Sequence, residues 1–94
     1  MIVDVRGQVQ AAWGDVQRPV FPRSAIKALQ ALPLVETGAA DAFGFGDAEL
    51  ALACSSHEGE SRHVETAGAM LAACGMDESA LECGAHWPYS QAAA

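Results

Sequence analysis

Strand-like alternation of apolar and polar residues is confined to the segment from Met1 to Trp13, and helical spacing follows it. Arg6-Gly7 separates Met1–Val5 from Val9–Trp13, which predicts a β-hairpin with Gly7 in its turn. A lone hairpin is only marginally stable and needs further strands or a covering helix. The chain therefore predicts an α+β fold whose small antiparallel sheet is incomplete.

Apolar spacing and capping residues define the helices that follow the hairpin. The expected elements are an extended connector at Arg18–Pro22, helices at Ser24–Leu32, Pro33–Thr37, Asp47–Cys54 and Val64–Cys74, a short turn capped by Asp77, and the start of a helix at Ser90–Ala94. Pro33 predicts an end or a kink, because proline lacks the N–H that an interior helical position donates. Gly38 and Gly75 are expected to end the helices that precede them.

Size and charge restrict the possible partners of the chain. Ninety-four residues correspond to at most one small domain, so residues 1–94 are expected to form a single partial domain. Five basic and twelve acidic residues give a net charge of −7, which argues against a nucleic-acid partner and against an anionic membrane surface. No apolar run approaches the roughly 20 residues that cross a bilayer, and Met1 opens no signal segment. A cytoplasmic location is therefore expected.

The cysteines predict neither a disulfide framework nor a metal site. Cys54, Cys74 and Cys83 are odd in number and match no CxxC spacing, so we expect them to be small buried hydrophobes. A metal site built from His57, His63 and Glu60 would lack the helical i, i+4 ligand pair of known zinc motifs. The sequence therefore predicts no metal on this chain.

The first candidate for chemistry is the S-x-x-K tetrad of Ser24 and Lys27 at a helix start. Residues three apart lie on the same helical face, and a neighbouring amine can activate a serine hydroxyl. The helix is apolar nearly all round, so Lys27 is expected to be buried, which favours its neutral form. The alternative is that Ser24 is a helix cap and that Lys27 extends into solvent.

The second candidate is the polar segment from Cys54 to Glu60, which offers hydroxyl, imidazole and carboxylate groups. Roles in a catalytic group follow from geometry across the fold, so adjacency alone assigns none. The alternative is that the serines start a turn and that the carboxylates favour the N-terminus of the next helix. His86-Trp87-Pro88 is either a pocket wall or a core edge.

Several blocks, taken together and in order, resemble one family, the asparaginase II or rhizobial-type amidohydrolases. The matching blocks are Arg18–Lys27, Gln30–Glu36, Leu50–His57 with Gly59-Glu60, and Leu81–Pro88. The resemblance covers the chain from about Val5 to Ala94. It implies a serine-β-lactamase-like fold, shared with serine-type glutaminases, and hydrolysis of L-asparagine to L-aspartate and ammonia.

The resemblance also implies roles for individual residues. Ser24 would be the nucleophile, Lys27 its activating base, and Ser56 a second serine that passes protons between them. The adjacent Ser55 leaves two serines for that last role, and the alignment of the blocks favours Ser56. The expected substrate-binding residues are His57, Arg23 and Glu60.

Members of the family are much longer, so the resemblance implies that this sequence is truncated at both ends. The family's cysteine and lysine zinc ligands and a further active-site lysine have no counterpart here, so no cofactor is expected on this chain. Family members tend to be dimers, which makes a homodimer the expected assembly. The isolated chain is expected to turn over little or no substrate. Two other functions stay open: a penicillin-type serine acyltransferase or amidase, and an inactive fragment that serves as a structural or interaction piece.

Overall fold

The alternating N-terminal segment forms the expected hairpin in the computed structural model, which describes residues 1–88 and 91. β1 (Ile2–Val3) pairs antiparallel with β2 (Val9–Ala11). The Asp4 carboxylate closes the loop between them by accepting hydrogen bonds from the backbone N–H groups of Arg6 (2.8 Å) and Gln8 (3.0 Å). Gly7 has a φ of 79°, in the left-handed region that favours glycine. The predicted turn at Gly7 is confirmed.

The first helix corrects the prediction at Pro33. A 3-10 turn at Arg23–Ile26 leads directly into α1 (Lys27–Glu36), which passes through Pro33 without ending. The missing N–H costs one hydrogen bond, but the next turn still closes because Thr37 N–H donates to the Pro33 carbonyl at 3.1 Å. A separate helix over Pro33–Thr37 is therefore wrong. Gly38 follows with a φ of 79°, which confirms it as the end signal.

The later helices lie close to their predicted positions. They are α2 (Ala39–Ala42), which the sequence did not predict, α3 (Asp47–Ala53), α4 (Ser61–Ala73) and a 3-10 turn at Glu78–Ala80. The cap of α3 is Gly46 and not Asp47, because the Glu49 carboxylate accepts the Gly46 N–H at 2.9 Å. Gly75 ends α4, as predicted, with a φ of 71°.

The Asp77 carboxylate accepts the Ser79 N–H at 2.9 Å and caps the final turn, as predicted. The helix start expected at Ser90–Ala94 lies outside the described residues, except for Gln91. No helix within the described ranges is long and apolar enough to span a bilayer.

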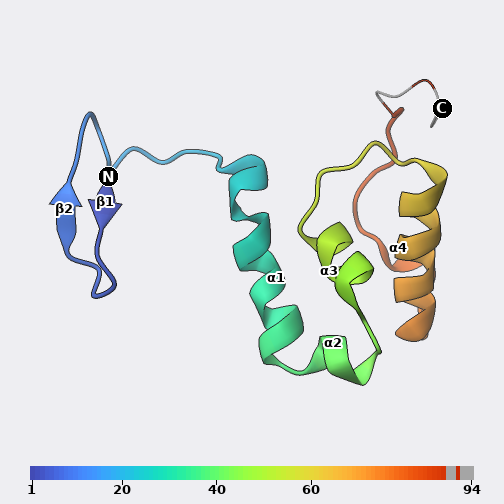
Figure 1. The fold of residues 1–94 in the computed structure, drawn as a ribbon. Helices are drawn as coiled ribbons and strands as arrows, with labels where there is room; N and C mark the ends of the chain where they lie inside the picture. The colour runs from blue at the N-terminus through green and yellow to red at the C-terminus, as the bar shows by residue number, and fades with distance from the viewer. Residues whose placement is uncertain (89–90, 92–94) are drawn as a thin grey trace.

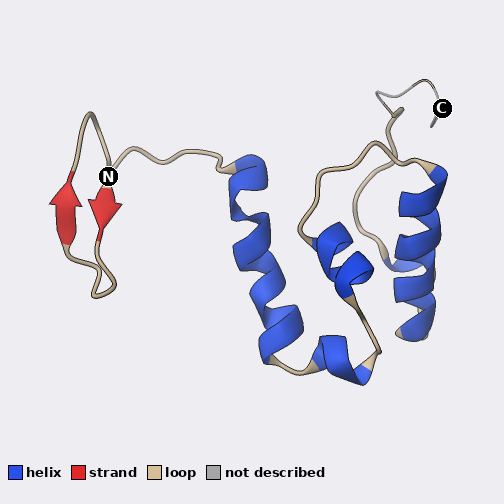
Figure 2. Ribbon diagram, viewed as in Figure 1, coloured by secondary structure: helices blue, strands red, loops and turns tan. Residues whose placement is uncertain are grey.

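The hairpin stands apart from the helices, and an extended segment joins it to α1 (Figure 1). α1 contacts both α2 and α3, and α3 packs against α4. Figure 2 shows the same division between a strand part and a helical part. A hairpin followed by consecutive helices confirms the α+β class at this coarse level.

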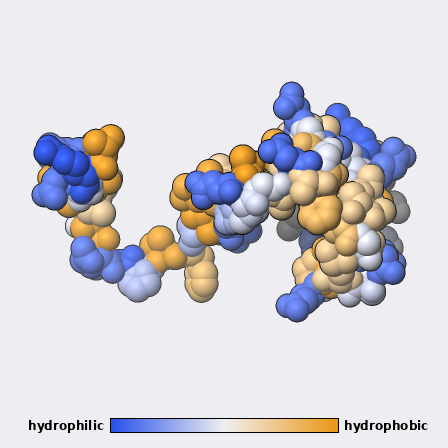
Figure 3. Space-filling view, turned by 90° about the horizontal axis from the view of Figure 1, so that it is seen from below, coloured by the Kyte–Doolittle hydropathy of each residue, from blue (hydrophilic) through white to orange (hydrophobic). Residues whose placement is uncertain are grey.

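The chain buries very little of its apolar surface. Ala40 is the one fully buried hydrophobic residue in the described part of the chain. The radius of gyration is 17.2 Å, against about 12 Å for a compact chain of this length. Apolar surface is visible over the hairpin, the connector and the helices in Figure 3. The helices of the described chain therefore contact each other without enclosing a hydrophobic core.

Two burial predictions are wrong for this reason. Leu29 on α1 is 64% exposed, and Lys27 is only half-buried. Cys54 and Cys83 are exposed and Cys74 is half-buried, and all three are free thiols. The described part of the chain does not bury these side chains, so the residues expected inside a core lie at or near the surface.

Candidate active site

The 3-10 turn before α1 places Ser24 beside a residue far along the chain. Its Oγ lies 2.9 Å from Ser56 Oγ. Pro22 and not Ser24 occupies the cap position of the turn, and its carbonyl accepts the Ala25 N–H at 3.2 Å. The interpretation of Ser24 as a helix cap is therefore wrong. Its hydroxyl is available for a tertiary contact.

The residue before Ser24 has an uncommon backbone conformation. Arg23 has a φ of 51°, the one positive value at a non-glycine residue in the described chain. Side chains other than glycine rarely adopt this region, and such strain is often found at functional sites. The local backbone is thus held in a less favourable conformation immediately before the candidate nucleophile.

Lys27 occupies the first turn of α1, and its side chain reaches the loop after α3, which Ser24 also contacts. Its Nζ donates to Ser56 Oγ at 2.7 Å and to the Ser55 carbonyl at 2.8 Å. The interpretation in which Lys27 extends freely into solvent is wrong, because two short hydrogen bonds hold its amine. The carbonyl of Ser55 was not anticipated, since no sequence signal marks a backbone acceptor in a distant loop.

The two adjacent serines have different environments. Ser56 Oγ contacts both the Ser24 hydroxyl and the Lys27 amine. Ser55 Oγ instead donates to the Leu52 carbonyl at 2.9 Å, near the end of α3. The geometry therefore brings Ser24, Lys27 and Ser56 into one hydrogen-bonded group and leaves the Ser55 hydroxyl outside it.

The three expected substrate-binding residues form no hydrogen bond with this group in the described part of the chain. His57 Nδ1 accepts the Gly59 N–H at 3.1 Å. Glu60 is the N-terminal cap residue of α4 and forms an ion pair with Arg62 at 3.4 Å. The Arg23 side chain is exposed and forms no hydrogen bond or ion pair with these residues within the described chain.

A second histidine supports His57. The ring centroids of His57 and His63 lie 4.8 Å apart at an interplanar angle of 33°. His63 Nδ1 accepts the Glu60 N–H at 3.2 Å, which fixes the ring at the start of α4. The sequence singled out His63 only as a metal ligand. No group of three or more His, Cys, Asp or Glu side chains that could hold a metal ion occurs among the described residues.

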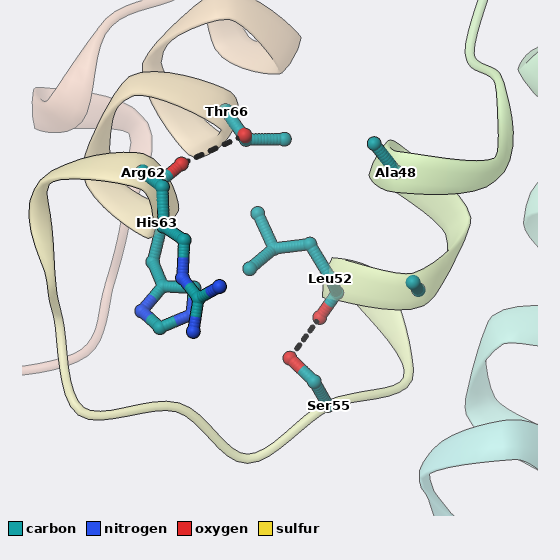
Figure 4. A pocket seen from close by; sticks show the side chains of 7 residues that line it. Ala48, Leu52, Ser55, Arg62, His63 and Thr66 are labelled. Carbon is teal, nitrogen blue, oxygen red and sulfur yellow. Dashed lines mark hydrogen bonds between the residues drawn. The ribbon is translucent and has the colours of Figure 1, made fainter.

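A pocket of about 380 Å³ lies between α3 and α4 (Figure 4). It is lined by Ala48, Ala51, Leu52, Ser55, Arg62, His63 and Thr66. In Figure 4 the Ser55 hydroxyl points to the Leu52 carbonyl, with Arg62 and His63 across the pocket. Ser24, Lys27 and Ser56 do not line this pocket.

A second pocket has a volume of about 250 Å³. It is lined by His57, Glu58, Gly59, His86 and Pro88. His86 and Pro88 therefore form a pocket wall, one of the two interpretations of that segment. His57 directly follows Ser56 in the chain, so this pocket lies next to the candidate catalytic group.

Comparison of the sequence with known protein families identifies the family of the chain. The family described as L-asparaginase II matches residues 1–94, which is the whole chain. Neither the curated proteins nor the solved structures contain a match. Because the family match extends over every residue, the chain belongs to the L-asparaginase II family.

Proposed function

We propose that this chain carries the nucleophilic centre of an amidohydrolase that converts L-asparagine to L-aspartate and ammonia. The family match supports the reaction class. The observation that carries the proposal is the hydrogen-bonded series from Ser24 Oγ through Ser56 Oγ to Lys27 Nζ, with distances of 2.9 and 2.7 Å. A serine in contact with a proton acceptor, which a third group orients, is the signature of an activated nucleophile.

In this proposal the attack of Ser24 is coupled to a proton relay. Ser24 Oγ forms a bond to the side-chain amide carbon of L-asparagine as its proton passes to Ser56 Oγ. Ser56 in turn passes its own proton to Lys27 Nζ, which must be in its neutral form to accept it. A neutral amine keeps two N–H donors, so the bond to the Ser55 carbonyl can remain. Lys27 Nζ lies 2.7 Å from Ser56 Oγ, within reach of this transfer.

The second half of the reaction runs the relay in reverse. The proton held on Lys27 returns through Ser56 to the amide nitrogen, the carbon–nitrogen bond breaks, and ammonia leaves. Water then attacks the β-aspartyl ester and gives its proton to the same relay, which restores Ser24. In this proposal the backbone N–H of Ser24 donates to the oxyanion that forms on the substrate carbonyl.

We further propose that this chain alone turns over L-asparagine slowly or not at all. Preorganised dipoles are most effective where water is excluded. Ser24 and Ser56 are exposed and Lys27 is only half-buried, so solvent reaches all three groups. Formation of the ester at Ser24 is therefore a more sensitive test than ammonia release.

The test is acylation by an activated β-ester of L-aspartate, followed by intact mass and peptide mapping. We expect one β-aspartyl group on Ser24 and none in Ser24→Ala. A β-lactam added in parallel tests the penicillin-type acyltransferase, which the same S-x-x-K and second serine permit. Labelling of Ser24 by the β-lactam and not by the aspartyl ester would replace the asparaginase assignment with that alternative.

A further inference from the structure

The pocket next to Ser56 offers a defined set of hydrogen-bonding groups. His57 Nδ1 accepts a backbone N–H, so the neutral ring must carry its proton on Nε2. The same ring lies beside that of His63, with the centroids 4.8 Å apart and the planes tilted by 33°. His57 therefore presents an N–H donor, at Nε2, to its surroundings.

His86 presents the opposite character. Its Nδ1 lies 3.1 Å from the Trp87 carbonyl oxygen. A carbonyl oxygen can only accept, so Nδ1 must carry the proton of the neutral ring. His86 Nε2 is then left with a lone pair and acts as an acceptor.

Glu58 adds a negative charge to the lining of the same pocket. Its side chain is exposed and forms no hydrogen bond or ion pair within the described chain. The lining thus combines one imidazole N–H donor, one imidazole acceptor and one carboxylate around about 250 Å³. An α-amino acid head group needs this combination, because its carboxylate accepts hydrogen bonds and its ammonium donates them.

We propose that His57, Glu58 and His86 form the subsite that binds the α-carboxylate and α-ammonium groups of the amino-acid amide; this inference rests on the proposed function. His57 Nε2 donates to the substrate carboxylate, while Glu58 and His86 Nε2 accept from the ammonium. Ser56 directly precedes His57 and contacts Ser24, so a head group held here lies near the candidate nucleophile. Glu58 and His86 are then specificity residues for α-amino acids.

The test compares truncated ligands on the Ser24→Ala variant, which binds without turnover. The ligands are L-asparagine, succinamate, which lacks the α-amine, and β-alaninamide, which lacks the α-carboxylate. NMR of the imidazole side chains follows binding at His57 and His86. We expect L-asparagine to shift both rings and each truncated ligand to bind about tenfold more weakly.

A charge-neutral variant supplies the protein side of the comparison. Glu58→Gln should weaken L-asparagine binding about tenfold. It should leave succinamate binding unchanged, because succinamate has no ammonium group for Glu58 to bind. Glu65→Gln removes an equal charge from an exposed site on α4 outside the pocket, and it should leave L-asparagine binding unchanged.

Equal affinity for L-asparagine and succinamate, no shift at His57 and His86, or no binding of L-asparagine would each overturn this inference. Acylation of Ser24 by the activated ester is measured separately in the parent chain. Acylated Ser24 with an unresponsive pocket would leave the nucleophile in place and remove only the subsite. Shifts at His57 and His86 with no acylation of Ser24 would support the subsite and remove only the nucleophile.

Discussion

The hydroxyl oxygens of Ser24 and Ser56 lie 2.9 Å apart, although 32 positions separate the two residues in the chain. The contact joins the turn before α1 to the loop after α3. Lys27 secures the same junction through its two hydrogen bonds to that loop. The three groups therefore meet in a chain that encloses almost no core, which ties their position to the local packing of α1 against α3.

Replacement of the relay serine is the first prediction. Ser56→Ala should slow acylation of Ser24 by about 10²–10⁴-fold, the usual contribution of a positioned proton-transfer group. Ser55→Ala is the matched control, because its hydroxyl bonds only the Leu52 carbonyl and the carbonyl that holds Lys27 is retained. Rates of ester formation from mass spectrometry provide the measurement. A larger loss in Ser55→Ala than in Ser56→Ala would reverse the assignment of the two serines.

The amine of Lys27 should be equally important. Lys27→Met removes the proton acceptor and both of its hydrogen bonds, so the acylation rate should fall by about 10²–10⁴-fold. Lys27→Arg should not rescue it, because a guanidinium stays charged and accepts no proton. The double variant Lys27→Met/Ser56→Ala should be little slower than either single variant, since the two groups act as a unit. Additive losses in the double variant would show that the two residues act independently.

The sequence predicted the parts of this site that depend on local spacing. The separation of Ser24 from Lys27 by three positions placed them together on one turn without further information. The third member was different: nothing in spacing alone selects Ser56 over Ser55, and only the family resemblance did so. The physical reason is that the two serines differ in their tertiary contacts. Ser24 and Lys27, which lie much earlier in the chain, contact Ser56 Oγ and not Ser55 Oγ, and local spacing does not contain that information.

The fold was predictable to the same extent: features set by neighbouring residues in the chain were correct, and features set by tertiary packing were not. Glycine end signals and apolar periodicity located the hairpin and most helices, because both act within a few residues. The continuation of α1 through Pro33 and the burial of Lys27 depend on what packs around α1, and the sequence pattern of one helix does not contain that information. The short helix α2 is three-quarters alanine and presents too few positions for a periodic signal.

Two glycines should respond in opposite directions to the same substitution. Gly38→Ala forces a side chain into a φ of 79° and should lower the free energy of unfolding by about 1–2 kcal/mol. Gly68→Ala, within α4, should raise helix stability by about 0.5–1 kcal/mol. An added Cβ meets nothing within 4 Å at either position, so sterics do not contribute. Urea titration followed by circular dichroism measures both; changes of the same sign would contradict the backbone argument.

Pro33→Ala should stabilise α1. The substitution restores the N–H that an interior helical residue donates and removes a ring that opposes the preceding turn. We expect increased helix content in far-UV circular dichroism and a gain of about 1–3 kcal/mol in the stability of α1. A loss of helix content would show that Pro33 supports the turn toward α2 in some other way.

The stability of the 3-10 turn at Glu78–Ala80 should depend on pH. The Ser79 hydroxyl and then the Ser79 N–H donate to the Asp77 carboxylate and hold its pKa below the ordinary value of 3.8. Because the pKa is lower in the folded turn than in the unfolded chain, the carboxylate contributes stability above pH 3.8, and that contribution is lost as the pH falls through the lowered pKa. NMR of the Ser79 amide should titrate with a midpoint below 3.8 and show no such step in Asp77→Asn. A midpoint at or above 3.8 would contradict the hydrogen-bond assignment.

The most direct test of the account is the fate of Ser24 when the chain meets an activated β-ester of L-aspartate. The account predicts a single β-aspartyl group on Ser24, its absence in Ser24→Ala, and its slow formation in Ser56→Ala. Ammonia release from L-asparagine, measured on the same samples, should stay near background. An unmodified Ser24, or equal modification of the parent chain and Ser24→Ala, would show that the hydrogen-bonded group of Ser24, Ser56 and Lys27 is not a nucleophilic centre.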